Sequence, residues 1–530
     1  MRISVGTTTA LAVALMLTCC AGTPEQAPNP AASSTTQTDS SKESAAESET
    51  TTENQQVVET RMVATDGSEL EVRVYPLSQV GEYVVLTADL IPTQIRDDSE
   101  WISGRIFGLD PAAGVNAPVG LLRLVDATGL RMHLPALDAA NKIVGTGGGS
   151  FVIKPEGLRV QQVYAAPDSN TSLGLLLPGH YIDELPVVEL APPAPTITED
   201  SQATSIDTTA VAVAPVVALD SISRQLDGAV QVIESSEEVQ IDLSGDVLFE
   251  TASAELSPEA NAMIDAAAKT INARGSGQVA VVGHTDNVGD DASNQTLSEQ
   301  RASAVARALK QLIDSADFDI TTSGRGETEP IAPNDNDANR QLNRRVTLTL
   351  VTEEVTRSEI TATGELPPFD KGPVATGAEG FDDALDADTT GAFHVSAPEA
   401  RRVGELLVVT VEAERTDVGT YNDAWAYNLA ASPNSYRGTE TTMEQWPFSP
   451  RLLVGDTAVY PLDYTIGTRD SGTVEYRLAG DNDAQQSAGP GQTLRFVALF
   501  PDVPDAKEIA IENSGAAWVK NYRLTNISVE

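Results

Sequence analysis

The chain has 530 residues, with 77 Asp and Glu against 34 Lys and Arg, so its formal net charge at pH 7 is −43. A charge of this sign argues against binding to nucleic acids or anionic membranes through counterion release. The length allows roughly three or four domains, and a hydrophobic content of 41% can supply their cores. The two cysteines are adjacent, Cys19 and Cys20, so the rest of the sequence has none for a disulfide, a Cys-ligated zinc or a cysteine nucleophile.

The N-terminal segment has the pattern of a signal peptide. Arg2 precedes an apolar run at residues 10–17 that is too short to span a bilayer. The end of this run, LTCCAG, resembles the processing site of bacterial lipoproteins, which implies that residues 1–19 are removed and that Cys20 is lipidated. Cys19 as the lipidated residue is a poorer match, and an ordinary secretory signal with two incidental cysteines is the remaining alternative.

Composition divides the rest of the chain into alternating ordered and polar regions. Short apolar runs separated by Asp-Gly, Pro and Gly turns predict two all-β domains, whereas strands and helices alternate between them. The segment after the signal lacks large apolar residues and is expected to be a disordered tether. The predicted regions are a tether at 20–60, an all-β domain at 61–192, a linker at 193–222, an α+β domain at 223–352, a linker at 353–375 and an all-β domain at 376–530.

The two all-β regions resemble each other. Three pairs of segments align in the same order, at offsets of 323, 329 and 336 residues: 80–89 with 403–412, 121–128 with 450–457, and 158–163 with 494–499. This order is typical of a duplication, although each match alone could arise by chance. Regions of this size and pattern suit an immunoglobulin-like sandwich, although no cysteine pair marks one.

The region between them predicts a β-α-β-α-β-β order, with both helices on one face of a mixed sheet. Residues 247–249 and 279–282 are apolar runs that we interpret as strands. Ser257 followed by Pro258 marks the start of the first helix.

Five motifs in this region occur in a fixed order. They are DVLF at 246–249, GHTDNVG at 283–289, NQTLSEQRA at 294–302, GRGETEPIAPN at 324–334 and NRRV at 343–346. Together they resemble the OmpA-like peptidoglycan-binding domain family, which includes peptidoglycan-associated lipoproteins and the periplasmic part of flagellar stator proteins. The resemblance covers about a quarter of the chain and does not extend to the β regions.

The resemblance implies a pocket that binds the meso-diaminopimelate of the peptidoglycan stem peptide without forming a covalent bond. Carried over by motif, Asp286 would accept the ammonium group and Arg301 would hold the carboxylate. A carboxylate and a guanidinium are suited to a zwitterion, because arginine can bind a carboxylate with two parallel hydrogen bonds. The same analogy places three further residues in the groove: Asn294, Leu297 and Arg345. Three others would contribute less: Asn287, Gly289 and Arg344.

The sequence gives little support for an enzyme. The four histidines are scattered without metal-ligand spacing, and neither a G-x-S-x-G nor an H-E-x-x-H motif occurs. His284, within the polar motif, is expected to anchor its loop. We therefore expect no catalytic activity, no cofactor and no metal, although a wall hydrolase within a β region is a further hypothesis.

These observations predict a non-catalytic envelope lipoprotein that links a membrane to peptidoglycan. Ala21 follows Cys20 where many lipoproteins of the inner membrane have Asp. This favours an outer membrane facing the periplasm if the host has one, and otherwise the cell membrane facing the wall. The alternative is an adhesin or envelope scaffold whose β domains bind another protein, with the central domain serving only as a wall anchor.

Overall fold

The computed structural model shows a protein that consists mainly of β-structure. It does not describe residues 1–55. The described residues all belong to one unit of the chain, Thr50–Glu530. The predicted signal peptide, Cys20 and nearly all of the predicted tether lie outside them. The described residues are 56–65, 67–96, 99–100, 102–103, 122–146, 152–168, 171–197, 205–235, 238–314, 316–352, 360, 365–384, 392–417, 424–425, 450–468, 474–481, 487–514 and 520–530.

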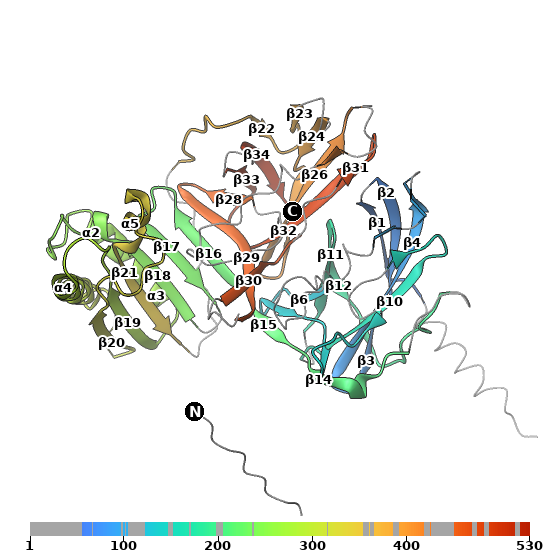
Figure 1. Ribbon diagram of the computed structural model, residues 1–530, viewed down its shortest axis with the longest axis horizontal. Coiled ribbons are helices and arrows are strands. Elements are labelled where there is room, and N and C mark those ends of the chain that lie inside the picture. The colour runs from blue at the N-terminus through green and yellow to red at the C-terminus, as the bar shows by residue number, and fades with distance from the viewer. Residues whose placement is uncertain are drawn as a thin grey trace, which may run out of the picture. The chain divides into compact units, whose positions relative to one another are not determined.

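The central part of the chain combines a mixed sheet with helices (Figure 1). β19 and β20 are parallel, and the other neighbours in this sheet are antiparallel. In spatial order the strands are β17 (Val230–Glu234), β18 (Glu238–Ser244), β21 (Arg345–Val351), β19 (Gly277–Gly283) and β20 (Phe318–Gly324). The helices are α2 (Gly245–Leu248), α3 (Ala260–Asn272), α4 (Asp291–Leu309) and α5 (Asp337–Asn343). No helix in the described part of the chain is both long enough and apolar enough to cross a membrane.

One hydrophobic core joins α3 and α4 to a single face of this sheet (Figure 1). Buried residues alternate along β18 and β19, so every second side chain points to the helices. The helices contribute apolar residues spaced three or four apart. The shared core includes Ile241, Leu243, Val279, Val281, Met263, Ile264, Ala267, Ile271, Ala302, Val305 and Leu309.

The interpretation of residues 247–249 as a strand is wrong. Val247 and Leu248 belong to the short helix α2, and Phe249 forms only an isolated bridge with Leu256. The sheet strand directly before the helices is β18, whose alternation of apolar and polar residues is the ordinary signal of a half-buried strand. A short apolar run does not distinguish a strand from a buried helical turn.

The first β part contains two main sheets. The first has the order β1-β2-β4-β3-β13, with β10 also paired to β4, and the second has the order β12-β11-β6-β7-β15. Their strands are β1 (Glu59–Thr65), β2 (Ser68–Val74), β3 (Leu77–Val80), β4 (Tyr83–Gln94), β6 (Arg123–Asp126), β7 (Arg131–His133), β10 (Leu158–Ala165), β11 (Leu173–Leu177), β12 (His180–Leu185), β13 (Val187–Val188) and β15 (Val216–Ala218). Four short strands form two separate pairs: β5 (Ile102–Ser103) with β9 (Val152–Ile153), and β8 (Leu137–Asp138) with β14 (Val211–Val213).

The second β part pairs its strands in the same way. β23-β24-β26-β25 corresponds to β1-β2-β4-β3, β32 pairs with β26 as β10 does with β4, and β34-β33-β28-β29 corresponds to β12-β11-β6-β7. The strands are β22 (Val374–Thr376), β23 (Phe381–Ala384), β24 (Ala392–Ser396), β25 (Glu399–Val403), β26 (Leu406–Arg415), β27 (Ala424–Trp425), β28 (Arg451–Val454), β29 (Thr457–Thr468), β30 (Val474–Leu478), β31 (Ser487–Ala488), β32 (Thr493–Pro501), β33 (Glu508–Asn513) and β34 (Tyr522–Val529).

The two β parts also share their strand register. Tyr83 lies opposite Ala165 in the first part, and Leu406 lies opposite Pro501 in the second. These partners are related by offsets of 323 and 336 residues, as are the aligned sequence segments. The aligned segments therefore occupy equivalent places in the two sheets.

Residues 193–222, expected to be a linker, contain the short helix η4 (Thr208–Ala210), β14, β15 and the start of β16 (Asp220–Gln225). β15 pairs with β7 of the first β part, and β16 pairs with both β29 of the second part and β17 of the central part. A Pro-, Thr- and Ala-rich composition does not prevent a segment from adding to the edge of an existing sheet, because the sheet supplies the hydrogen-bonding partners.

Candidate functional site

Glycines bring α4 against the polar loop 284–290 that follows β19. A Cβ atom on Gly283 would collide with the Ser298 carbonyl oxygen, and one on Gly324 would collide with the Ser298 hydroxyl. Gly289 has φ +114°, which side-chain-bearing residues rarely adopt. α4 therefore packs directly on the ends of β19 and β20, and its first three turns lie beside the loop.

Asp286 is buried in this loop and held by two hydrogen bonds to its carboxylate. Its Oδ1 accepts the Val288 backbone N–H at 3.1 Å, and its Oδ2 accepts Arg344 Nη1 at 2.6 Å. The carboxylate oxygens keep further acceptor positions, because each oxygen has two lone pairs. Asp286 can therefore receive an additional cationic donor.

Arg301 is buried in the third turn of α4. Its guanidinium carbon lies 5.0 Å from the centroid of the Phe249 ring, and its Nε donates to the Ser253 carbonyl at 2.9 Å. Burial lowers the pKa of Arg301, although the nearby carboxylates of Asp246 and Asp286 act in the opposite direction. Within the described residues, its Nη1 and Nη2 have no hydrogen-bond partner. This leaves two donors of an oriented cation available.

Asn294 and Leu297 lie on the same face of α4 as Arg301, because residues spaced three and four apart are neighbours on a helix. The Asn294 amide nitrogen donates to Glu327 Oε2 at 2.7 Å and to the Asp286 carbonyl at 3.3 Å. Leu297 is half-buried between Asn294 and Arg301 in this row. Asn294 thus contacts Asp286, while Leu297 and Arg301 continue the same face of α4, and the Asp286 carboxylate is near enough to Arg301 to act on its pKa.

Arg345, which was expected in this groove, has other partners. Its guanidinium lies 3.7 Å from Asp242 and 3.4 Å from the Glu329 carbonyl. Arg345 opens β21, and side chains alternate along a strand, so Val346 enters the helix-covered core and Arg345 points to the opposite face of the sheet. Arg344, the preceding residue, contacts Asp286 instead.

Two acidic residues at the site were not anticipated. Asp246 accepts Arg344 Nε and Nη2, both at 2.6 Å, and Glu327 accepts the Asn294 amide. Both belong to motifs quoted above, DVLF and GRGETEPIAPN, so their positions were visible in the sequence. Their partners were not visible, because Arg344 is 98 residues from Asp246.

His284 is held in its neutral form at neutral pH. Burial, reinforced by the charges of Arg345 and Arg325, lowers the pKa of His284 to about 3. Its backbone N–H donates to the Arg345 carbonyl at 2.9 Å, which ties the loop to β21. Among the residues with described positions, no group of three or more His, Cys, Asp or Glu is placed to hold a metal ion.

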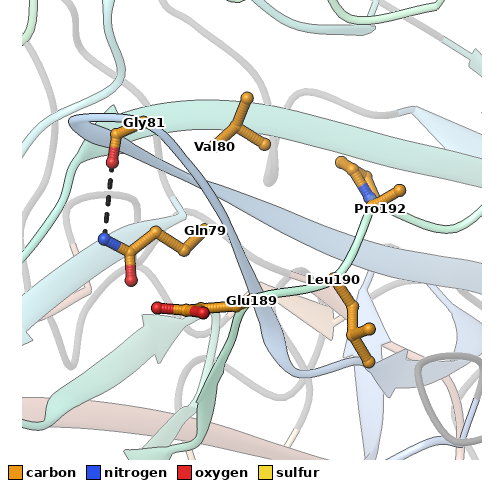
Figure 2. A pocket seen from close by; sticks show the side chains of 7 residues that line it. Gln79, Val80, Gly81, Glu189, Leu190 and Pro192 are labelled. Carbon is orange, nitrogen blue, oxygen red and sulfur yellow. Dashed lines mark hydrogen bonds between the residues drawn. The ribbon is translucent and has the colours of Figure 1, made fainter. Parts of the chain in front are cut away.

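A pocket of about 560 Å³ lies elsewhere, at the turn between β3 and β4 (Figure 2). Its described lining includes one charged residue, Glu189, while the Gln79 amide is bonded to the Gly81 carbonyl at 3.4 Å. None of the predicted binding residues lines it. The pocket therefore offers no set of converging polar groups comparable to the groove beside Asp286.

Comparison with known proteins concerns the central part. Residues 248–344 match the sequence model of the OmpA family. Among solved structures, the chain is similar to the cell wall anchor of the T6SS from Pseudomonas aeruginosa, at 34% identity over 24% of this chain and 89% of that chain, with a TM-score of 0.22. It is also similar to the periplasmic domain of Helicobacter pylori MotB (26% identity, 24% and 83% covered, TM-score 0.21) and to the peptidoglycan-associated lipoprotein from Burkholderia pseudomallei (27% identity, 20% and 87% covered, TM-score 0.18). No curated protein matched the chain.

Proposed function

Because residues 248–344 form a domain of the OmpA family, we propose that the protein binds peptidoglycan without a covalent bond, in the groove between Asp286 and Arg301. The observation that carries the proposal is the state of Arg301. Its guanidinium is buried, oriented by Phe249 and Ser253, and bonded within the described residues only through Nε. Such a group can bind a carboxylate with two parallel hydrogen bonds and so compensate its own desolvation.

The ligand group we propose is meso-diaminopimelate of the stem peptide, whose free end carries an ammonium and a carboxylate. Arg301 would take the carboxylate and Asp286 the ammonium. Asn294 contributes an amide oxygen, because its amide nitrogen is already bonded to Glu327 and to the Asp286 carbonyl. Leu297 supplies apolar contact for the methylene chain between the two charged groups.

A single groove of this kind binds weakly. Hydrogen bonds to charged groups contribute about 1.5–3 kcal/mol each, and ordering the ligand offsets part of that gain. The wall repeats the stem peptide many times, and a membrane anchor on Cys20 would hold the groove close to it. Retention then follows from effective concentration. In this proposal the lipid is in the outer membrane, facing the periplasm, or in the cell membrane of a host without one.

The second candidate function belongs to the β parts, and one observation favours it: they are packed together. The buried Arg123 of the first part donates to Tyr464 Oη at 3.2 Å and to the Leu478 carbonyl at 2.9 Å in the second. A cluster of buried apolar residues also spans both parts. Two duplicated, immunoglobulin-like domains joined in this way would form one scaffold for another envelope protein, with the central part as its wall anchor.

Sedimentation with diaminopimelate-type peptidoglycan tests the proposed function. The full-length protein without lipid should pellet with the wall, whereas Asp286→Ala and Arg301→Ala should remain largely in the supernatant. Each loses a charge-assisted contact, which corresponds to a decrease in affinity of about tenfold or more.

Two exposed residues provide matched controls, Arg307 on the same helix as Arg301 and Asp319 on β20. Arg307→Ala and Asp319→Ala should pellet like the wild type. If the Asp286 and Arg301 variants also pelleted like the wild type, the groove would not be the binding site. Crosslinking in cells addresses the second candidate, because recovery of wall fragments alone would count against a protein partner.

A further inference from the structure

Arg344 joins two carboxylates at the edge of the groove. Its Nε and Nη2 donate to the two oxygens of Asp246, and its Nη1 donates to Asp286 Oδ2, all at 2.6 Å. Asp246 lies in the first turn of α2, and Asp286 lies in the loop after β19. Arg344 directly follows the last residue of α5. Two parallel bonds to one carboxylate fix the plane of a guanidinium, so Asp246 determines where Arg344 Nη1 lies.

Arg344 in turn determines the orientation of the Asp286 carboxylate. With Oδ2 bonded to Arg344 and Oδ1 bonded to the Val288 N–H at 3.1 Å, the carboxylate cannot rotate without losing a hydrogen bond. A further donor must approach the lone pairs that these two bonds leave. The direction in which Asp286 receives an ammonium group is therefore set before the ligand arrives.

The cluster also stabilises the charge of Arg344 against burial. The hydrogen bond to Asp246 raises the pKa of Arg344, and the bond to Asp286 raises it further, which together outweigh the effect of burial. Arg301 makes different contacts, since its hydrogen bond goes to the Ser253 carbonyl and its ring contact is with Phe249, while the charges of Asp246, Arg344 and Asp286 also act on it. At one end of the proposed groove Arg344 orients the Asp286 carboxylate, and at the other end Arg301 presents its guanidinium.

We propose that Asp246 and Arg344 are positioning residues for the ammonium group of the ligand alone. Asp246 holds Arg344, and Arg344 holds the Asp286 carboxylate in the orientation that receives the ammonium. The inference rests on the proposed function and deepens it, because it divides the groove into an ammonium half and a carboxylate half. Within the described residues neither Asp246 nor Arg344 is hydrogen-bonded to Arg301, so each should affect recognition of the carboxylate only through its charge, and far less than recognition of the ammonium.

A pair of stem tripeptides separates the two halves. One ends in meso-diaminopimelate, and the other ends in 2-aminopimelate, which keeps the distal carboxylate and lacks the distal ammonium. Titration calorimetry with the full-length protein should show that Asp246→Asn and Arg344→Gln each weaken binding of the first peptide by about tenfold, the effect of impairing one charge-assisted contact. The same variants should change binding of the second peptide far less, because they alter only the charge near Arg301 and no hydrogen bond to it.

Arg301→Ala is the reference variant, because it should weaken binding of both peptides. Arg344→Lys keeps the positive charge but cannot make the two parallel bonds, so its affinity for the first peptide should fall between those of Arg344→Gln and the wild type. Asp246→Asn and Arg344→Gln both disrupt the Asp246–Arg344 ion pair, each by changing one partner. If one variant fails to fold, the other still tests whether this ion pair positions Asp286 for the ammonium.

Equal losses on both peptides would overturn the inference, because Arg344 would then contact the carboxylate or merely support the fold. Unchanged binding of the first peptide would also overturn it. Tighter binding would show that Arg344 competes with the ammonium for Asp286. A wild-type protein that bound neither peptide would instead contradict the proposed function itself.

Discussion

Two arginines, Arg159 in the first β part and Arg301 in the central part, have closely similar surroundings but different partners. Both are buried, and each guanidinium carbon lies over an aromatic ring, 4.9 Å from the Tyr75 centroid for Arg159 and 5.0 Å from the Phe249 centroid for Arg301. All three nitrogens of Arg159 donate hydrogen bonds, and two of them bind Asp89, at 2.6 and 2.8 Å. Within the described residues, Arg301 has only the bond from its Nε.

The direction in which the pKa of each arginine is shifted shows what this difference means. Burial opposes the charge of Arg159, but Asp89 and Tyr75 outweigh burial and raise the pKa of Arg159. Burial lowers the pKa of Arg301, because within the described residues no carboxylate is hydrogen-bonded to it and the more distant Asp246 and Asp286 do not outweigh burial. A buried arginine with a complete set of partners stabilises its surroundings, whereas one with unused donors retains a desolvation cost that a ligand carboxylate can offset.

A second acid–arginine pair occupies the place of Asp89–Arg159 in the second β part. Glu412 lies opposite Arg495 as Asp89 lies opposite Arg159, and its carboxylate is 2.9 Å from Arg495 Nε. The side chains of Glu412 and Arg495 are 31% and 37% exposed, against 2% and 9% for Asp89 and Arg159. The two acid–arginine pairs therefore occupy the same register, but Asp89–Arg159 is buried whereas Glu412–Arg495 is partly exposed to water.

The largest effect on stability is expected for Asp89→Asn. The substitution keeps the shape of the side chain but leaves the Arg159 charge buried without its carboxylate, which should cost about 3 kcal/mol of unfolding free energy. Urea denaturation of the first β part measures it. Replacing both residues, Asp89→Leu with Arg159→Met, should recover part of this loss because no buried charge remains.

Acid should weaken the first β part through His180, which lies near Arg495 and Glu412. Burial, together with the charges of Arg495 and Arg61, lowers the pKa of His180 from 6.5 to about 4. A lowered pKa means that the folded state prefers the neutral ring, so its stability is fully present above pH 6.5 and is lost as the pH falls toward 4. The loss should reach about 3 kcal/mol at full titration, because each pKa unit corresponds to about 1.4 kcal/mol.

His180→Gln identifies the source of that loss. Glutamine can still donate to the Met62 carbonyl, which the His180 ring contacts at 2.9 Å, but it does not titrate. The decrease in urea midpoint between pH 7 and pH 4.5 should be smaller in the variant than in the wild type. An identical decrease in both proteins would assign the acid sensitivity to other groups.

Glu412→Gln should have the smallest effect. An ion pair with this degree of exposure is screened by water and typically contributes less than about 1 kcal/mol. The urea midpoint should move only slightly, and added salt should reduce the difference further. A loss as large as that of Asp89→Asn would mean that exposure does not distinguish the two pairs.

The aligned segments predicted more of the β architecture than composition did. Their offsets correspond to strand partners in both parts, and they place Asp89 and Glu412 at equivalent positions. They did not predict which pair is buried, because Tyr75 and the carbonyl of Ala194, two partners of Arg159, lie outside the aligned strands. The polar composition of 193–222 likewise gave no sign of the strand pairings that it makes.

At the candidate site, motif order located Asp286, Asn294, Leu297 and Arg301, which the structure brings together. The motifs predicted Arg345 in the groove and Arg344 as a lesser contributor. In the structure Arg344 is the one that contacts Asp286, which depends on the residue that opens β21, and the motifs do not reveal that residue.

Arg301→Met tests the central claim most directly, measured for both wall binding and stability beside Asp89→Asn. The account predicts that Arg301→Met abolishes sedimentation with peptidoglycan while its urea midpoint stays at or above that of the wild type, because a buried charge with unused donors is removed. Asp89→Asn should keep wall binding under native conditions and lose stability. Sedimentation of Arg301→Met at the wild-type level would contradict the claim that this arginine is reserved for a ligand.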